Sequence, residues 1–374
     1  MELRFCIQDP TDTNTTYLYE AILSAAVNAV DWRGMYAFAT CDGIDCLIED
    51  KVVQELIKAG EINLLVGIDA VTNRFTLERL RDLERQHCKF SAKVFWNETS
   101  GLFHPKLSYF TYKDGRRTLI VGSGNLTPGG LNKNFEAYTV VMADELEDLD
   151  VSALDDFLLR HAAAIRSIDN EVLERAKRNL AHSIKMAQPP STIAPPPPIE
   201  QRRTKSAQDL TTSTDFNRIL IAEIPKAGGR WAQVHFNADI IEKYFRITDI
   251  NMQRVYLTHV DKSGDRANIE VRPCVRSERN KNCKIEIRAA KNLEYPAPDD
   301  GRPILLVRER QLRTFDYMFF MPDTSGYKDV SGPLKTLPSI GKGVARVILT
   351  IEKLAELWPN CPLLTSGNNA EYDM

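Results

Sequence analysis

Three short stretches between residues 104 and 136 hold side chains that could together act on a phosphodiester. They are His104-Pro105-Lys106, Gly122-Ser123-Gly124-Asn125 and Asn134-Phe135-Glu136. An imidazole can attack phosphorus, an ammonium and an amide can hold phosphoryl oxygens, and a carboxylate can accept from the far ring nitrogen of a histidine and so fix its tautomer. We therefore predict one site formed by the nucleophile His104, the oxygen-binding Lys106 and Asn125, the carboxylate Glu136, and Ser123 as a support of the loop.

Two strands would have to position these groups. A strand over Phe103–Thr111 would turn His104 and Lys106 to the same face, since residues two apart in a strand share a face. A second strand over Thr118–Val121 would run into the Gly-Ser-Gly-Asn turn. Its small residues let backbone N–H groups approach an anion.

This order of motifs resembles the phospholipase D superfamily, and more closely its single-motif nucleases, the BfiI and NgoFVII types of restriction endonuclease. Their pattern is His-x-Lys, then Ser-Gly-Asn-hydrophobic-Thr, then Asn-hydrophobic-Glu, and the second element here reads Ser123-Gly-Asn125-Leu126-Thr127. Thr111 stands where the phospholipases carry an aspartate, which favours nucleases over lipases. The order of elements is similar over most of residues 1–186, although the specific motif spans only 104–136.

Phosphodiester hydrolysis by histidine needs a neutral imidazole that attacks and a protonated one that donates to the leaving oxygen. Only one His-Lys-Asn set occurs in the chain. We therefore expect a homodimer in which each copy contributes His104 to one shared site, and a phosphohistidine intermediate. We expect no metal, nucleotide or other cofactor, because no His, Cys or Asp cluster has metal-ligand spacing.

His87-Cys88-Lys89 repeats the first motif without the other two. No Gly-Ser-x-Asn follows it at the right distance, and it falls where a helix would run into a strand. We predict that His87 is an exposed histidine at a strand edge with no catalytic role.

The chain of 374 residues, 43% of them hydrophobic, is long enough for two domains with separate cores. Its seven cysteines are odd in number and form no close CxxC pair, which indicates reduced cysteines in the cytoplasm. The chain contains no apolar run of 18 residues and no basic-then-apolar leader at its start. We expect a cytoplasmic protein without a membrane partner.

A proline-rich stretch, 188–199, marks the boundary between the two expected domains. The predicted division is a catalytic and dimerisation domain over 1–186, a linker over 187–208, a recognition domain over 209–361 and a polar tail over 362–374. Charge differs across the boundary: residues 1–199 hold 21 Lys+Arg against 28 Asp+Glu, a net −7, and residues 210–361 hold 24 against 19, a net +5. A basic second half is typical of a domain that binds a polyanion.

Before the boundary, helical and strand patterns alternate, which predicts an α/β fold with a mixed sheet flanked by helices. We expect helices over Thr15–Val30, Lys51–Lys58 and Thr76–Gln86, strands over Met35–Thr40, Ile62–Ile68 and Phe90–Phe95, and a long, mostly helical segment over Asp144–Met186. After it the pattern is mainly β. The expected strands there are Arg218–Ile224, Trp231–Phe236, Arg254–His259, Asn268–Cys274, Lys284–Arg288, Ile304–Arg308, Thr314–Met321 and Arg346–Ile351, with short helices over Ala238–Phe245 and Ile351–Trp358.

Two groups of residues in the second half could contact double-stranded DNA, because phosphates attract Arg and Lys, and Arg and Asn can read base edges. One is a basic hairpin with Arg272, Arg276, Arg279 and Lys281, together with Lys284 and Arg288; the other is an arm with Lys226, Arg230, Gln233 and His235. Single-motif restriction nucleases carry a pseudobarrel similar to the plant B3 DNA-binding domain at this position. Residues 222–230 and the stretch Arg313-x-Phe-x-Tyr317 look like the NgoFVII version.

Together these observations favour a sequence-specific, metal-independent restriction endonuclease. A phospholipase D-like lipid phosphodiesterase is the first alternative, which the basic, β-rich half and the lack of membrane-directed segments disfavour. The second alternative is a DNA-binding subunit of an ATP-dependent restriction complex, because some NgoFVII-like nucleases look dependent on a helicase-type ATPase partner.

Overall fold

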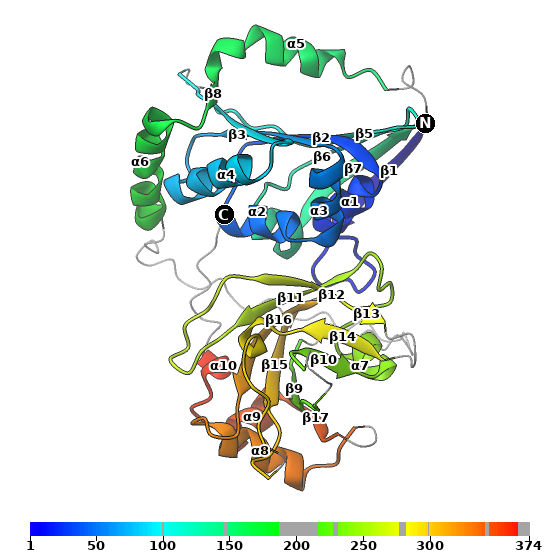
Figure 1. Ribbon diagram of the computed structural model, residues 1–374, viewed down its shortest axis with the longest axis vertical. Coiled ribbons are helices and arrows are strands. Elements are labelled where there is room, and N and C mark those ends of the chain that lie inside the picture. The colour runs from blue at the N-terminus through cyan, green and yellow to red at the C-terminus, as the bar shows by residue number, and fades with distance from the viewer. Residues whose placement is uncertain are drawn as a thin grey trace, which may run out of the picture.

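The computed structural model of the protein describes residues 1–98, 101–144, 149–186, 216–226, 231–276, 282–297, 299–340 and 344–365. The expected linker, 187–208, lies outside these residues. Figure 1 shows a mixed α/β N-terminal part, residues 1–186, above a mainly β C-terminal part, residues 216–365. The predicted fold class, a mixed sheet flanked by helices followed by a mainly β unit, is confirmed.

The N-terminal part is built on one eight-stranded sheet. β2, β3 and β4 run parallel, and every other neighbouring pair is antiparallel. In sheet order the strands are β1 (Glu2–Gln8), β7 (Glu136–Ala143), β6 (Arg117–Gly122), β5 (Lys106–Tyr112), β2 (Ala29–Tyr36), β3 (Glu61–Gly67), β4 (Phe90–Phe95) and β8 (Ile165–Ser167).

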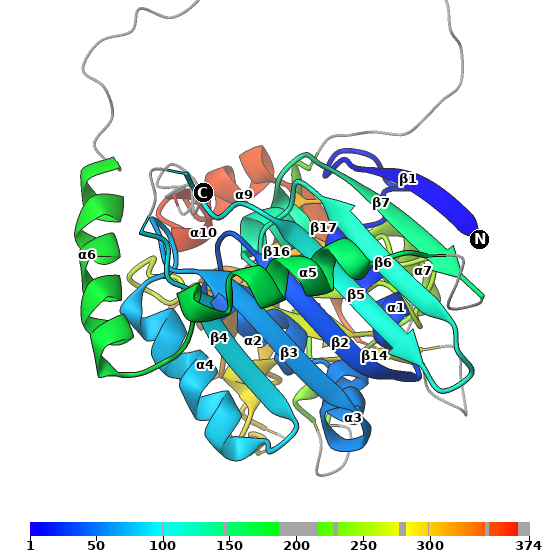
Figure 2. The ribbon, with the colours of Figure 1, turned by 90° about the horizontal axis from the view of Figure 1, so that it is seen from above.

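Helices cover both faces of this sheet (Figures 1 and 2). One face packs against α1 (Leu18–Ala26), α2 (Cys41–Ile48), α3 (Lys51–Ala59) and α4 (Arg74–Gln86), and α6 (Asn170–Met186) lies beside α4. The other face carries α5 (Ser152–Arg160), followed by a 3₁₀ turn, Ala162–Ala164. α5 covers Met35, Leu65, Phe95 and Phe103. No described helix combines the length and the apolar character that crossing a membrane requires.

Sequence patterns located most of these elements. α3, α4, β3, β4 and β6 were predicted to within two residues at either end, whereas β1, α2 and β7 were missed. The helix expected over Thr15–Val30 is shorter, because Asn28 has a positive φ of 60° and ends it, and β2 begins at Ala29 rather than at Met35. The expected helical segment Asp144–Met186 is interrupted by β8, which pairs with β4.

The strand expected over Phe103–Thr111 was wrong at its start. β5 begins at Lys106, so His104 precedes the strand. Pro105 has no N–H for the ladder, and Phe103 turns aside to stack on Phe95 with ring centroids 4.4 Å apart. His104 and Lys106 therefore do not lie side by side on one strand face.

The C-terminal part contains two sheets. The six-stranded sheet has the order β12 (Glu270–Pro273), β11 (Arg254–His259), β16 (Thr314–Phe320), β15 (Ile304–Gln311), β9 (Arg218–Glu223) and β17 (Arg346–Thr350), and the three-stranded sheet has the order β10 (Gln233–Phe236), β14 (Cys283–Glu286) and β13 (Val275–Arg276). Side chains such as Phe236, Phe245 and Phe315 fill one core of this part. The helical segments are α7 (Ala238–Lys243), a 3₁₀ turn (Arg288–Ala290), α8 (Tyr327–Thr336), α9 (Ile351–Leu357) and α10 (Pro362–Thr365).

All eight strands and both helices expected in this part are found, with shifts at their ends. α8 was missed because Gly332 and Pro333 interrupt its helical pattern. The tail expected over 362–374 is corrected at its start, since Pro362–Thr365 forms α10 and Leu363 is fully buried in the second core of this part.

Candidate active site

The three sequence motifs meet at one end of the eight-stranded sheet. Lys106 is the first residue of β5, Ser123 follows β6, and Glu136 opens β7. Lys106 pairs with Tyr36 at the carboxyl end of β2, and Gly122 pairs with Tyr138. Antiparallel pairing of β5, β6 and β7 therefore brings residues up to 32 positions apart to the same sheet edge.

His104 and Lys106 are in direct contact although they do not share a strand face. The Lys106 Nζ lies 2.8 Å from Nδ1 and 3.1 Å from Nε2 of His104, and 3.2 Å from the His104 carbonyl oxygen. His104 is exposed and its ring meets the Phe38 ring edge-on at 5.7 Å. An ammonium can donate only to an unprotonated ring nitrogen, so this contact favours neutral imidazole.

The electrostatics of the His104–Lys106 pair also favour the neutral form of the His104 ring. Partial burial, and then the neighbouring Lys106 charge, lower the pKa of His104 below its ordinary value. Burial also lowers the pKa of Lys106, while the Glu136 carboxylate opposes that shift. The lowered pKa leaves His104 neutral, as a nucleophile must be, at a pH where an ordinary histidine is partly protonated.

Asn125 is oriented by the chain that follows β2. Its Oδ1 accepts from the Phe38 N–H at 3.2 Å, and the adjoining Leu126 exchanges backbone hydrogen bonds with Phe38 and Thr40. Because a backbone N–H can bond only to the oxygen of the amide, the Nδ2 hydrogens point elsewhere. No other described residue accepts from this Nδ2, so it is available to an anionic oxygen.

A short π-helical turn, Gly129–Lys133, holds the Asn125 backbone from behind. At Gly130 an added Cβ would lie 2.3 Å from the Asn125 nitrogen and 2.5 Å from its carbonyl oxygen. Only glycine permits this approach. Close packing at Gly130, the second residue of the Gly-Gly pair that follows the motif, therefore fixes the position of the Asn125 backbone and with it the position of the amide.

Ser123 and Glu136 form a small polar group beside the pair. The Ser123 Oγ donates to Glu136 Oε2 and accepts from the Ala137 N–H at 3.0 Å, and Asn134 Nδ2 donates to Glu136 Oε1 at 3.3 Å. Ser123 thus joins the loop after β6 to the start of β7, and its supporting role at the site stays a prediction. Glu136 is satisfied by Ser123 and Asn134 within the chain, and its expected contact with a histidine ring stays a prediction.

Two residues at the site were missed from the sequence. Phe38 packs on His104 and orients Asn125, and Gln8, at the end of β1, binds the loop that leads to Glu136. Gln8 is fully buried, an unusual place for a glutamine. A glutamine directly after the apolar residues Phe5-Cys6-Ile7 was the only sequence signal.

His87 lies away from this site. It caps the C-terminus of α4, just before β4, and is half-buried rather than exposed as we expected. β4 and β2 run parallel, so the start of β4 is at the opposite end of the sheet from Tyr36 and Lys106. The structure thus separates the second His-x-Lys from the other motifs.

The two groups proposed to contact DNA partly converge in the three-stranded sheet. Gln233 of the arm pairs with Glu286, and His235 pairs with Lys284 of the hairpin. Arg276 is exposed on β13, and Lys226 is exposed with its Nζ 5.8 Å from the Tyr295 ring centroid. Arg230, Arg279 and Lys281 lie outside the described residues.

Two arginines of the hairpin are engaged in ion pairs within the chain. Arg272 binds the buried Glu270 at 3.0 Å, and Arg288 reaches across to Glu49 of the N-terminal part at 3.2 Å. The charge that the hairpin presents to a ligand is therefore smaller than its sequence suggests. Among the described cationic residues of the hairpin, Arg276 and Lys284 form no ion pair within the described part of the chain.

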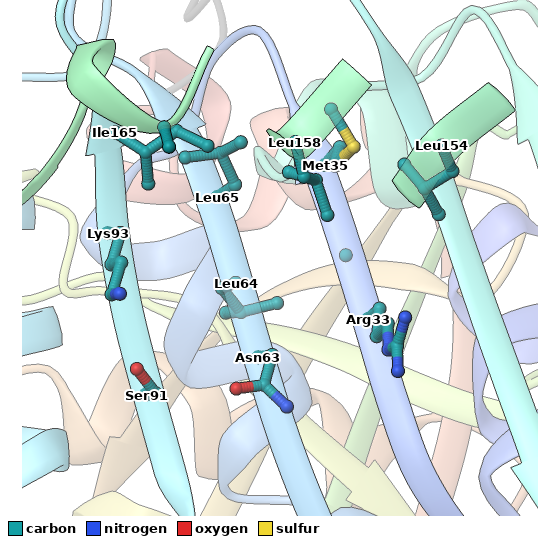
Figure 3. Close-up of a pocket in the computed structure, with 12 residues that line it drawn as sticks. Arg33, Met35, Asn63, Leu64, Leu65, Ser91, Lys93, Leu154, Leu158 and Ile165 are labelled. Atoms are coloured by element: carbon teal, nitrogen blue, oxygen red, sulfur yellow. The ribbon is translucent and has the colours of Figure 1, made fainter. Parts of the chain in front are cut away.

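A cavity of about 480 Å³ lies elsewhere, between α5 and the strands β2, β3 and β4 (Figure 3). Arg33, Asn63 and Lys93 line one end and Met35, Leu65 and Leu158 the other. His104, Lys106 and Asn125 do not line it, so it is separate from the candidate site. In the described part of the chain, no three His, Cys, Asp or Glu side chains are grouped so that they could hold a metal ion.

Solved structures similar to this chain are found at low identity. NucT from Helicobacter pylori matches at 10% identity and a TM-score of 0.32, over 44% of this chain and 99% of its own. Nuc from Salmonella typhimurium, a phospholipase D family member, matches at 14% and 0.30, over 44% and 97%. Yeast tyrosyl-DNA phosphodiesterase matches at 14% and 0.28, over 47% and 41%. No family model and no curated protein matches the chain. Scores this low carry no argument about function.

Proposed function

We propose that this protein is a restriction-type endonuclease that hydrolyses DNA phosphodiesters through a phosphohistidine on His104, without a metal ion. The observation that carries the proposal is the contact between the His104 ring and the Lys106 ammonium, set beside an Asn125 amide whose NH₂ group is available. A nucleophile that is kept neutral, a cation and an amide donor are the groups that attack at phosphorus requires.

In the first step the neutral imidazole of His104 attacks phosphorus, an N–P bond forms and the bond to the leaving oxygen breaks. The leaving oxygen takes a proton from the His104 imidazolium of a second copy of the chain. That imidazole, now neutral, then removes a proton from water, which attacks phosphorus, and the N–P bond breaks. Lys106 and Asn125 hold the phosphoryl oxygens throughout.

The need for a second copy is supported by an uncovered apolar area beside the site. Met35, Leu107, Val121, Thr139 and Phe5 are paired in turn across β2, β5, β6, β7 and β1, so their side chains share one face of the sheet. α5 covers the first two of these residues but leaves β1 and β7 open (Figure 2).

The exposed fractions on this open part of the face are high for apolar side chains. Leu3 and Phe5 are each 65% exposed and Ile7 is 54% exposed, with Val121 at 44% and Phe135 at 69%. A contiguous apolar patch of this kind is typical of a protein interface. Because it adjoins β7 and the loop before Glu136, a two-fold contact here would bring two candidate sites together.

Recognition of double-stranded DNA is proposed for the C-terminal part, as the B3-like resemblance implies. The sheet that joins Gln233 and His235 to Lys284 supplies polar and cationic side chains on adjoining strands, and Arg276 lies on the strand next to Lys284. Arginine and glutamine are residues that read base edges in the major groove. An activity against lipid has no comparable support.

The test is cleavage of plasmid DNA in EDTA by the purified protein, its His104→Ala variant and its His87→Ala variant. We expect wild type and His87→Ala to cut, and His104→Ala to lose at least about 1000-fold in kcat while retaining DNA binding. After reaction with ³²P-labelled DNA and denaturation, protein with an acid-labile label should be recovered from wild type and from His87→Ala, but not from His104→Ala. Activity lost in EDTA and restored by magnesium would overturn the mechanism, as would equal loss in both variants. Cleavage only after addition of a helicase-type ATPase would assign the chain to an ATP-dependent complex.

A further inference from the structure

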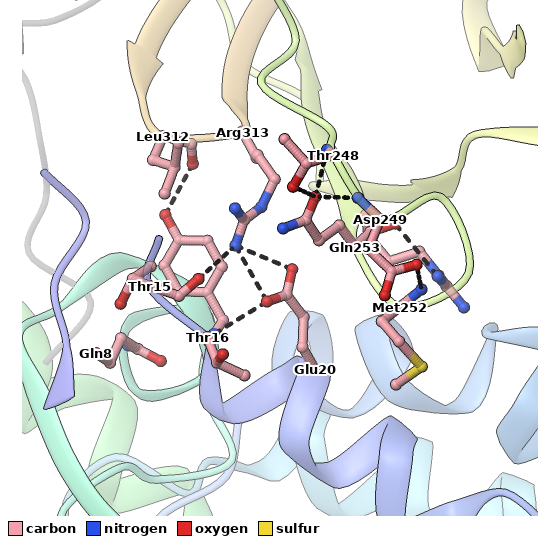
Figure 4. Close-up of polar contacts among 12 residues, drawn as sticks. Gln8, Thr15, Thr16, Glu20, Thr248, Asp249, Met252, Gln253, Leu312 and Arg313 are labelled. Atoms are coloured by element: carbon pink, nitrogen blue, oxygen red, sulfur yellow. Dashed lines mark hydrogen bonds and ion pairs between the residues drawn. The ribbon is translucent and has the colours of Figure 1, made fainter. Parts of the chain in front are cut away.

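The tip of the β15–β16 hairpin of the C-terminal part is built into the N-terminal part (Figure 4). Leu312 is fully buried and belongs to the core that otherwise consists of N-terminal side chains and Tyr256. Its N–H donates to the Pro10 carbonyl at 3.3 Å, and its carbonyl accepts from the Tyr17 hydroxyl at 2.8 Å. The two parts are therefore joined by a packed and hydrogen-bonded turn.

The second residue of this turn, Arg313, is fully buried together with its charge. Its Nη2 donates to Glu20 Oε2 at 3.0 Å and to the Thr15 carbonyl at 3.2 Å, and its guanidinium lies 4.8 Å from the Tyr17 ring centroid. Arg313 also has a φ of 55°, which is unfavourable for arginine. A buried charge in a strained backbone conformation persists only where surrounding contacts stabilise it, and here Glu20 and Thr15 supply those contacts. The position of the turn therefore determines the position of the Glu20 carboxylate.

Hydrogen bonds of Glu20 and Thr15 connect the Leu312-Arg313 turn to Gln8. Glu20 accepts from the Tyr17 N–H at 3.1 Å and so fixes the first turn of α1. In the same turn, the Leu18 N–H donates to Gln8 Oε1 at 2.8 Å. The Thr15 hydroxyl bridges the residues on either side of Gln8, accepting from the Asp9 N–H at 2.8 Å and donating to the Ile7 carbonyl at 3.2 Å.

From Gln8 the contacts continue into the candidate site. Its Nε2 donates to the Asn134 carbonyl at 2.8 Å and reaches the Gly130 carbonyl at 3.4 Å. Gly130 packs against the Asn125 backbone, and the Asn134 side chain holds Glu136. One buried glutamine thus links the start of α1 to both sides of the loop that carries the oxygen-binding amide and the carboxylate.

We propose that Gln8 is a positioning residue for the candidate site, and that the inserted Leu312-Arg313 turn sets its position, so that the site is complete only when the C-terminal part is docked. This inference rests on the proposed function. Gln8 touches no substrate and acts by holding the loop of residues 125–136. If the DNA-recognition part also positions residues of the cleavage site, only the intact protein with both parts docked would cleave DNA.

The experiment compares Gln8→Met, which keeps the side-chain volume, with Arg313→Asn, which tolerates a positive φ, and with Arg313→Lys, which restores the charge. Arg254→Asn is the matched control. Arg254 is also buried and crosses between the two parts, but it binds Asp50, which caps α3 and accepts from the Tyr19 hydroxyl. Neither of those side-chain contacts leads to Gln8, and the hydrogen bond from the backbone N–H of residue 254 to Glu20 is kept in the asparagine variant.

Two readouts are made on the full chain: amide hydrogen exchange at Leu131, Asn134 and Ala137, whose N–H groups are bonded within the loop, and kcat and KM for DNA cleavage in EDTA. We expect Gln8→Met and Arg313→Asn to speed exchange at these amides by about tenfold or more. We expect kcat to fall about 100-fold with KM nearly unchanged. Arg313→Lys should recover part of both effects, and Arg254→Asn should leave both within about twofold of wild type.

Unchanged loop exchange in Gln8→Met would overturn the positioning role, and equal effects from Arg254→Asn would reduce the turn to a general contribution to stability. If Arg313→Asn does not fold, Gln8→Met and Arg313→Lys decide the question. If the wild-type protein cuts no DNA while loop exchange responds as expected, the proposed function has failed but the structural link stands.

Discussion

At the scale of single residues, the contact between Lys106 and His104 ties the charge of one group to the reactivity of the other. The ammonium penalises protonation of the ring, and the lowered pKa of His104 widens the pH range in which the neutral nucleophile exists. The same ammonium must leave the ring to hold a phosphoryl oxygen. Binding of the substrate phosphate would therefore free the ring lone pair at the moment it is needed.

This coupling predicts the direction of a pH effect. We expect an NMR titration to show the His104 ring protonating below the ordinary histidine value of about 6.5. Because one His104 must be neutral to attack and the His104 of the second copy must be protonated to donate, activity should fall as the pH drops through that lowered pKa, and it should also fall at higher pH as the imidazolium is lost. In Lys106→Met the pKa should rise, since the cation is gone, without reaching the ordinary value, since burial remains the larger cause. The acid limb of the remaining activity should move up with it.

Lys89→Met provides the control, because Lys89 stands in the second His-x-Lys and lies outside the site. It should leave the His104 titration in place. A His104 pKa that stays constant or falls in Lys106→Met would show that the ammonium does not act on the ring.

At the scale of elements, the loop between β6 and β7 depends on how closely the π-helical turn approaches Asn125. We expect Gly130→Ala to displace that turn, because the new Cβ would lie 2.3 Å from the Asn125 nitrogen. The variant should lose about 1–3 kcal/mol of unfolding free energy and most of its activity. Thermal denaturation and plasmid cleavage measure the two effects.

Gly332→Ala is the matched control for that substitution. Gly332 lies within α8, and an added Cβ would meet nothing within 4 Å. Alanine favours helix over glycine by roughly 1 kcal/mol, so this variant should be as stable as wild type or more so, with full activity. Equal behaviour of the two variants would contradict the close packing behind Asn125.

Helices and strands were predictable from the sequence where a local pattern of apolar and polar residues determined their bounds. Phe90–Phe95 alternates between buried and outward-facing side chains, and its predicted bounds were correct. β1 was missed because its alternation turns Leu3 and Phe5 to an exposed face. The start of β5 was misplaced because Phe103, which precedes the strand, stacks on Phe95 of β4 and draws the chain away from the ladder.

The residues of the candidate site were likewise predictable only where the spacing along the chain indicates that they lie together. His104, Lys106, Ser123, Asn125 and Glu136 could be grouped because their spacing is that of consecutive antiparallel strands. Gln8 and Phe38 could not be found in this way, because their roles depend on pairings of β1 with β7 and of β2 with β5, which no spacing reports. Which strand lies beside which is a property of the whole sheet.

At the scale of the whole molecule, the proposed shared site requires two copies to meet through the apolar face of β1. Phe5→Glu should prevent this meeting, because it places a charge among side chains that would be buried. Sedimentation should show a shift from dimer to monomer, together with loss of cleavage and retention of the fold. Phe75→Glu is the control, since Phe75 is 59% exposed but lies on α4.

Mixed dimers test the shared site directly. A dimer of one wild-type and one His104→Ala subunit should bind DNA as the parent does but fail to turn over. Independent sites would leave roughly half the activity, as uncoupled positions do. Half activity, or a cleaving monomer, would remove the shared site while leaving a nuclease function open.

The C-terminal part should fold and bind DNA when expressed alone from about residue 208, provided that α10 is retained. Leu363 is fully buried, so a fragment that ends at Cys361 should be less stable than one that ends at 374 by about 2–5 kcal/mol. DNA affinity should fall steeply as salt increases. A folded fragment that binds no DNA at low salt would place recognition elsewhere in the protein.

The inserted hairpin tip also limits how recognition parts can be exchanged between chains of this kind. A chimera joined within residues 187–208 keeps a continuous chain, yet it presents a foreign turn to the socket of Pro10, Tyr17 and Glu20 that receives Leu312 here. The socket and the hairpin tip would have to be exchanged together, or Leu312 and Arg313 would have to be introduced into the incoming hairpin by mutation. The unit that evolution or a designer can swap is therefore bounded by this joint and not by the proline-rich segment.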